Sequence, residues 1–187
     1  MKTLEIVAVV FGILSVYLNA RQNVLGWATG LVNVGLYTWF FWAGKLYALM
    51  ALQVFFAAIS LYGWYQWRRG GERHIGIAVT RTPPRLGALL AIGVTAATVA
   101  LGWYLDRYTE DQQPFVDAGV SVISLAGQWM MARKYLETWA VWIAVNLVSV
   151  PLFVVRGEFP TAFQYTVFLG LAVNGLLQWH RSLRASS

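Results

Sequence analysis

Long apolar segments recur along almost the whole chain, and they limit what it can fold into. Each is close to the roughly 20 residues that a helix needs to cross the hydrocarbon core of a bilayer. The seven segments are Leu4–Ala20, Val24–Ala43, Tyr47–Trp67, Leu86–Leu105, Phe115–Ala132, Thr138–Val155 and Thr161–Trp179. The chain is 58% hydrophobic and only 12% charged, against about 45–50% and about 25% in globular domains. The sequence therefore predicts an all-α membrane protein with seven transmembrane helices.

The connections between these segments predict how the 187 residues are organised. Most connections are short, so neighbouring helices should form antiparallel hairpins. The exception is the loop Arg68–Arg85, which carries Gly70-Gly71 and Pro83-Pro84. We expect one transmembrane domain, residues 1–187. Within it, residues 1–67 would form a first set of three helices, 68–114 the long loop and a linker helix, and 115–187 a second set of three.

Basic residues are distributed unevenly between the two ends of the predicted bundle. One end carries four of them, Lys2, Lys45, Arg107 and Arg156. The other end carries ten: Arg21, Arg68, Arg69, Arg73, Arg81, Arg85, Arg133, Lys134, Arg181 and Arg184. Lys and Arg are enriched in cytoplasmic loops, so we expect the N-terminus outside and the C-terminus in the cytoplasm. The net charge of +6 is thus interpreted as membrane orientation, with lipid and not nucleic acid as the partner.

The two halves of the chain resemble each other at an offset of 112 residues. The matching pairs are Ala20-Arg21 with Ala132-Arg133, Trp27-Ala28 with Trp139-Ala140, Phe56 with Phe168, Gly63 with Gly175, Gln66-Trp67 with Gln178-Trp179, and Arg69 with Arg181. A single helix between two such triplets would make them parallel, an arrangement known in transporters. The alternative is that both halves share only helix ends with aromatic belts and basic flanks.

Trp139, Trp142 and Asn146 of the sixth segment share one helical face, because they lie at positions i, i+3 and i+7. Two indoles one turn apart, with a carboxamide a turn deeper, would suit a flat polar ring. An indole face also attracts a cation by about 0.5–2 kcal/mol. The alternative is that Trp139 belongs to an interfacial aromatic belt and that Asn146 bonds a neighbouring helix.

Four further predicted helices carry polar or aromatic side chains that lipid would not favour. These are Asn33 and Tyr37 in the second, Gln53 in the third, Gln128 in the fifth and Asn174 in the seventh. Polar side chains within transmembrane segments mostly face the bundle interior. We therefore expect a shared polar cavity, although each residue taken alone could serve helix packing.

Several motifs are absent from the sequence. There is no Gly-x-x-x-x-Gly-Lys-[Ser/Thr] motif of an ATPase and no pair of acidic residues in the middle of the membrane. With no Cys and two His, neither a thiol nucleophile nor a histidine-rich metal site is available. We expect neither an enzyme nor a protein with a cofactor.

Blocks in both halves of the chain resemble the PnuC family of vitamin transporters. The blocks are Leu46-Tyr47-Ala48, Leu52-Gln53-Val54-Phe55, Leu61–Trp67, Ala132–Trp139 with Trp142 and Asn146, and Leu171–Gly175. The resemblance implies a 3+1+3 helix fold like that of full-length SWEET transporters, often a trimer, in the bacterial cytoplasmic membrane. It also implies facilitated diffusion of nicotinamide riboside, which a separate cytoplasmic kinase then traps.

The resemblance also implies roles for the site residues. The family pattern Trp-x-x-Trp-x-x-x-Asn is intact at Trp139, Trp142 and Asn146. The two indoles would hold the cationic pyridinium, and the amide and hydroxyl groups would meet Asn146 together with Gln53, Gln128 and Asn174. Thiamine, riboflavin and deoxynucleosides are alternatives within the family. From another class, a membrane scaffold or receptor would place its polar residues in separate helix contacts.

Overall fold

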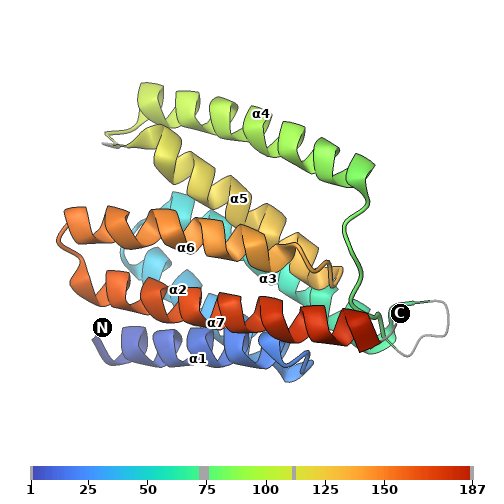
Figure 1. Ribbon diagram of the computed structural model, residues 1–187. Coiled ribbons are helices and arrows are strands. Elements are labelled where there is room, and N and C mark those ends of the chain that lie inside the picture. The colour runs from blue at the N-terminus through green and yellow to red at the C-terminus, as the bar shows by residue number, and fades with distance from the viewer. Residues whose placement is uncertain (1, 72–75, 111–112, 186–187) are drawn as a thin grey trace.

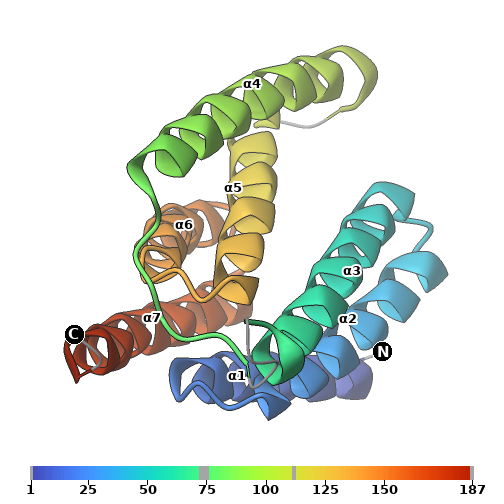
Figure 2. The same ribbon diagram turned by 90° about the vertical axis from the view of Figure 1, so that its right-hand side faces the viewer.

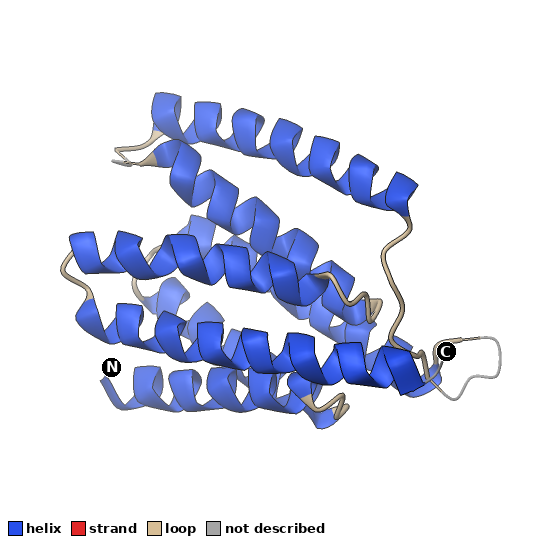
Figure 3. Ribbon diagram, viewed as in Figure 1, coloured by secondary structure: helices blue, strands red, loops and turns tan. Residues whose placement is uncertain are grey.

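The protein is all-helical in the residues that the structure describes. The computed structural model describes residues 2–71, 76–110 and 113–185. They form the helices α1 (Lys2–Ala20), α2 (Leu25–Ala43), α3 (Tyr47–Arg69), α4 (Pro84–Tyr108), α5 (Pro114–Ala132), α6 (Thr138–Val155) and α7 (Phe159–Ala185). Figure 3 shows these helices and their loops. Each apolar segment coincides with one helix, so the all-α prediction is confirmed.

The helix ends differ most from the predicted segments where polar residues extend a helix. Helix α7 continues past Trp179 to Ala185, and α3 continues past Trp67 to Arg69. Pro84 and Pro114 stand in the first turns of α4 and α5, where a missing N–H disrupts no helical hydrogen bond. Apolar runs therefore identify each helix but underestimate the length of those that polar residues extend, such as α3 and α7.

Six helices form a closed ring, and α4 lies outside it. Around the ring each helix packs against the next, in the order α1, α2, α3, α5, α6, α7 and back to α1. Helix α4 packs against α5 and against no other described helix. Figure 2 shows α4 on the outer side of α5, apart from the other helices. The halves of the chain therefore meet at two seams, α3 with α5 and α7 with α1.

The helices present large apolar side chains to the outside. Helices α4, α5 and α6 are long and apolar enough to cross a membrane, and α1 contains the shorter apolar run Ile6–Ala20. Exposed apolar residues occur on every helix, and Leu89 and Ile92 of α4 are each 67% exposed. Exposed apolar surface of this extent is typical of contact with lipid.

Four tryptophans from four helices form the core of the ring. Trp27 (α2) meets Trp67 (α3) edge to face, with centroids 5.4 Å apart, and Trp139 (α6) meets Trp179 (α7) in the same way at 5.4 Å. Trp67 and Trp179 join the two pairs at 5.8 Å. All four side chains are buried. We call this set the tryptophan cluster; it connects the two halves of the chain.

The contacts around the tryptophan cluster repeat at the same offset of 112 residues. Trp67 Nε1–H donates to the carbonyl of Met131 at 3.2 Å, and Trp179 Nε1–H donates to the carbonyl of Asn19 at 3.2 Å. Each of these two indoles thus bonds the other half of the chain, Trp67 at the last turn of α5 and Trp179 at the last turn of α1.

The long loop crosses the end of the ring beside the tryptophan cluster. Thr80 N–H donates to the carbonyl of Lys134 at 3.1 Å, and Leu136 N–H donates to the carbonyl of Thr80 at 2.9 Å. The backbone N–H and the hydroxyl of Thr82 both donate to Glu137 Oε2 at 2.8 Å. Val79 is buried among the cluster residues. The α3–α4 loop is therefore fastened to the α5–α6 loop, which its length did not predict. Arg73, counted in the charge bias, lies outside the described residues.

Glycine allows the close approach of Trp139 to α7, which provides a test of the core. A β-carbon on Gly175 would lie 2.6 Å from the Trp139 indole, whereas one on Gly170 of the same helix would meet nothing within 4 Å. We expect Gly175→Ala to destabilise the fold by about 1–3 kcal/mol. Thermal unfolding in detergent measures this, with Gly170→Ala as the matched control. Equal melting temperatures for both variants would contradict the packing described.

Candidate functional site

Trp139 lies in the tryptophan cluster and has no accessible surface. It is 0% exposed, its edge meets Trp179, and its ring lies over Gly175. Its Nε1–H is buried and has no hydrogen-bond partner among the described residues. In this conformation neither ring face is open to a ligand. The structure therefore separates the two indoles that the sequence placed together: Trp139 is fully buried, whereas Trp142 is only partly buried.

Trp142 and Asn146 lie further along the same face of α6. Trp142 is partly buried and packs against the tryptophan cluster, and a β-carbon on Gly127 of α5 would lie 3.5 Å from its indole. Asn146 is 3% exposed and donates its amide N–H to the carbonyl of Trp142 at 2.7 Å. That bond holds the carboxamide against its own helix, one turn from the indole.

Gln128 of α5 is the predicted site residue that reaches across a seam of the ring. Its amide N–H donates to the hydroxyl of Ser60 on α3 at 3.4 Å, and Ser60 is 1% exposed. Gln128 follows Gly127, which lies against Trp142. The neighbouring α5 residues Gly127 and Gln128 thus contact Trp142 of α6 and Ser60 of α3, respectively, and Asn146 lies one turn beyond Trp142 on α6. Ser60 stands seven residues from Gln53 on one face of α3.

The remaining predicted residues lie around the ring. Gln53 is half-buried on α3, two turns before Ser60. Asn33 donates to the carbonyl of Ala8 in α1 at 2.7 Å, so its amide serves a helix contact in this conformation. Tyr37 stacks on Phe41, with centroids 5.8 Å apart.

Tyr165 of α7 also carries a phenol; it stacks on Phe153 of α6, with ring centroids 5.1 Å apart.

Asn174 lies apart from this group. Its side chain is exposed and accepts a hydrogen bond from Gln178 of the same helix. The structure therefore does not bring Asn174 to the other predicted residues.

Charged side chains that the structure describes lie at the two ends of the ring. Arg156 donates to Asp117 at 3.0 Å at one end. At the other, the Lys134 ammonium lies 4.6 Å from the centroid of the Trp67 ring, and burial lowers the pKa of Lys134. No group of three His, Asp or Glu that could hold a metal occurs among the described residues. Between the charged ends, the site offers an indole, carboxamides, a hydroxyl and phenols.

A ring of apolar helices with uncharged polar groups between charged ends defines a multi-pass membrane protein. Comparison with protein families identifies it further. Residues 2–181 match the family described as nicotinamide mononucleotide transporter. The chain belongs to this family and is a membrane transporter, not an enzyme.

Known proteins similar to this chain agree with the family. It is 30% identical to the nicotinamide riboside transporter PnuC of Escherichia coli, over 97% of this chain and 86% of that protein. It is 28% identical to the riboflavin/roseoflavin transporter RibM of Streptomyces davaonensis, over 98% and 87%. The crystal structure of the vitamin B3 transporter PnuC matches with a TM-score of 0.78 at 25% identity, over 98% of this chain and 83% of that one. The resemblance to the PnuC family noted from sequence is confirmed.

The different burial of the two α6 indoles predicts different effects on stability. Trp139→Ala should destabilise the fold by about 3–5 kcal/mol, because it empties a fully buried position. Trp142→Ala should cost less, because its side chain is only partly buried. Thermal unfolding of both variants in detergent tests this. A larger loss for Trp142→Ala would contradict the roles assigned to the two rings.

Proposed function

We propose that this chain carries nicotinamide riboside across the bacterial cytoplasmic membrane by facilitated diffusion. A separate cytoplasmic kinase then traps the imported nicotinamide riboside by phosphorylating it. The observation that carries the proposal is the placement of Trp142 and Asn146 on α6 and of Gln128 on the neighbouring helix α5, next to the Gly127 that Trp142 contacts. Nicotinamide riboside has a planar cationic ring, a carboxamide and a ribose. An indole face and two carboxamides match these three parts.

Each predicted site residue has a role in the proposal. Trp142 stacks on the pyridinium, while Asn146, Gln128 and Gln53 bond the carboxamide and the ribose hydroxyls. Tyr37 borders the site from α2 beside Asn33. Asn174 contributes a further carboxamide from α7. Trp139 holds α6 against α7 and so positions Trp142.

The proposal includes a duplicated architecture. Residues 1–67 and 115–187 would be parallel repeats, with 68–114 as loop and linker helix, in the 3+1+3 arrangement of full-length SWEET transporters. The repeated tryptophan contacts support this, because α3 bonds α5 as α7 bonds α1. All seven helices would cross the membrane. A homotrimer is proposed from the family resemblance alone.

Riboflavin is the second candidate substrate, because the relative RibM is described as a riboflavin/roseoflavin transporter. Thiamine and deoxynucleosides are further alternatives. Family membership favours all of these over a scaffold or receptor. A binding panel of purified protein with nicotinamide riboside, riboflavin, thiamine and a deoxynucleoside would rank them.

Facilitated diffusion predicts the end point of uptake. Since the sequence has neither an ATPase motif nor an acidic pair in mid-membrane, nicotinamide riboside should enter empty vesicles only until both sides are equal. Radiolabelled uptake into proteoliposomes measures this, with and without an imposed proton or sodium gradient. Gradient-driven accumulation without an internal kinase would contradict the proposed mechanism.

The site assignment predicts which variants lose affinity. Trp142→Ala should weaken nicotinamide riboside by about 1–2 kcal/mol, or roughly 5–30-fold, because the cation loses an aromatic face. Asn146→Leu should also weaken binding, because a hydrogen-bonding group is lost. Calorimetric titration of folded, monodisperse protein gives the affinities.

Trp39→Ala is the matched control, since Trp39 is 58% exposed on α2. It should bind like the wild type. If both site variants also bind like the wild type, the α6 face is structural, and the site lies on α2 and α3.

The proposed orientation places the N-terminus outside and the α3–α4 loop and C-terminus in the cytoplasm, in line with the bias of basic residues. A phosphatase reporter that is active only outside the cytoplasm should be inactive when fused to the C-terminus. High activity of that fusion would reverse the topology.

A further inference from the structure

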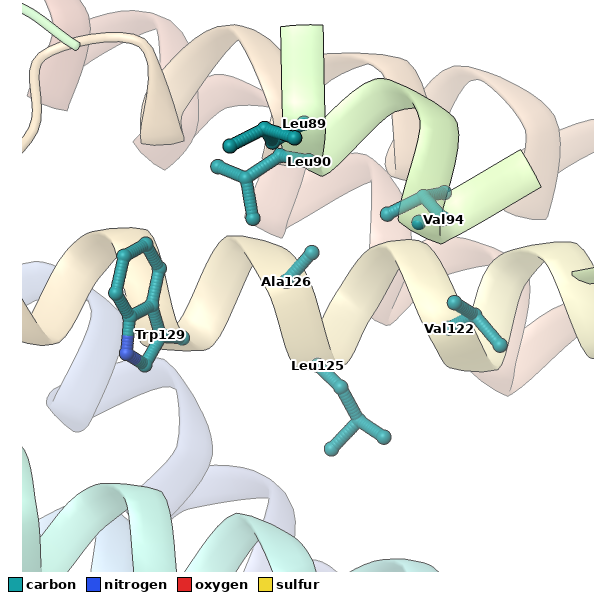
Figure 4. Close-up of a pocket in the computed structure, with 8 residues that line it drawn as sticks. Leu89, Leu90, Val94, Val122, Leu125, Ala126 and Trp129 are labelled. Carbon is teal, nitrogen blue, oxygen red and sulfur yellow. The ribbon is translucent and has the colours of Figure 1, made fainter. Parts of the chain in front are cut away.

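Helix α4 leaves an apolar groove against α5 that the transport site does not use. The groove has a volume of about 410 Å³. Its walls are Leu89, Leu90, Gly93 and Val94 of α4 and Val122, Leu125, Ala126 and Trp129 of α5. Figure 4 shows Leu89 and Leu90 on the side of α4 that faces Ala126 and Trp129.

The groove is open because the two helices pack closely at one end only. Near the α4–α5 loop, a β-carbon on Gly102 would overlap the ring of Phe115, and one on Gly119 would lie 3.5 Å from Thr98. Figure 1 shows the helices diverging from that loop toward the other end. There, a β-carbon on Gly93 would meet nothing within 4 Å. The described residues therefore leave the wedge open.

A cationic side chain stands at the mouth of the wedge. Arg85 lies one turn before Leu89 and continues the α4 side of the groove. It is exposed and has no ion pair with any residue in the described ranges. Its neighbour Arg81 differs, because it faces Glu137 at 4.0 Å. The mouth thus offers an unpaired positive charge above an apolar trough.

The length of the groove matches half of a bilayer. From Arg85 to Val94, α4 rises by about 13 Å at 1.5 Å per residue. One leaflet contributes about half of a hydrocarbon core of about 30 Å. A molecule with its charge at Arg85 and its chain along the groove would end near the midplane. A phospholipid matches both the depth of the groove and the positive charge at its mouth, whereas a second copy of this chain is not expected to match either.

We propose that the α4–α5 wedge is a binding site for one anionic phospholipid of the cytoplasmic leaflet. Its phosphate pairs with Arg85, and one acyl chain lies between Gly93 and Ala126. The bound lipid holds the free half of α4 against the ring. The choice of leaflet rests on the orientation proposed above, whereas the contacts do not depend on the transported vitamin.

Thermal unfolding in detergent tests the site. The protein is titrated with anionic dioleoylphosphatidylglycerol (the glycerol lipid) or with zwitterionic dioleoylphosphatidylcholine (the choline lipid). A lipid that binds only the folded state raises the melting temperature with concentration. We expect the glycerol lipid to stabilise the wild type at lower concentration than the choline lipid. Arg85→Ala should raise the required concentration of the glycerol lipid about fivefold, the change expected for about 1 kcal/mol per basic residue.

Two matched pairs separate the groove from general lipid effects. Gly93→Leu should fill the groove and abolish the preference for the glycerol lipid. Gly35→Leu on α2 should keep that preference, because a β-carbon there also meets nothing within 4 Å and Gly35 lies far from the groove in sequence and on another helix. Arg184→Ala at the end of α7 is the control for Arg85→Ala.

The outcomes are distinguishable. Equal effects of Arg184→Ala and Arg85→Ala, or an unchanged preference in Gly93→Leu, would overturn the proposal. A changed oligomer mass in Gly93→Leu, measured by light scattering, together with an unchanged lipid response would assign the groove to a second copy instead. None of these readouts requires vitamin binding, so a wrong substrate assignment would leave the result intact.

Discussion

The contact between the indoles of Trp67 and Trp179 is the interaction on which the ring depends. A ring of six helices can close only if both seams between the halves are held. Trp67 and Trp179 meet each other there, and each bonds a backbone carbonyl of the opposite half. Aromatic pairs contribute about 0.5–1.5 kcal/mol beyond burial, and the two carbonyls lie in the last turns of α1 and α5, where each also accepts a backbone N–H. The polar site lies next to this cluster, so its geometry depends on how the seams close.

The sequence predicted the helices well because a membrane imposes one condition on every span. Backbone groups must be satisfied internally and side chains must be apolar, so segments such as Thr138–Val155 appear directly in the hydrophobic pattern. The pattern is less informative about the residues beyond the end of a span. The polar continuation of α7 to Ala185 and the fastening of Thr80 to the α5–α6 loop depend on tertiary contacts.

The candidate site was predicted in part, because periodicity gives the face of a helix but not the depth. Trp139 and Trp142 share a face, yet one is fully buried against Gly175 while the other is only partly buried. Asn33 and Asn146 look alike in sequence, but one bonds α1 and the other its own helix. Only the order of helices around the ring distinguishes such residues, and short loops alone do not determine that order.

The closure of the ring by α7 against α1 has a consequence for how the chain is made. Helix α1 is synthesised first. The carbonyls of Asn19 and Ala20 can accept a hydrogen bond from the indole of Trp179 only after about 160 further residues have been added. Until that indole arrives, the first three helices have an open edge in the bilayer. The ring therefore closes only once the last helix is present, and a chain interrupted before α7 lacks the seam between α7 and α1.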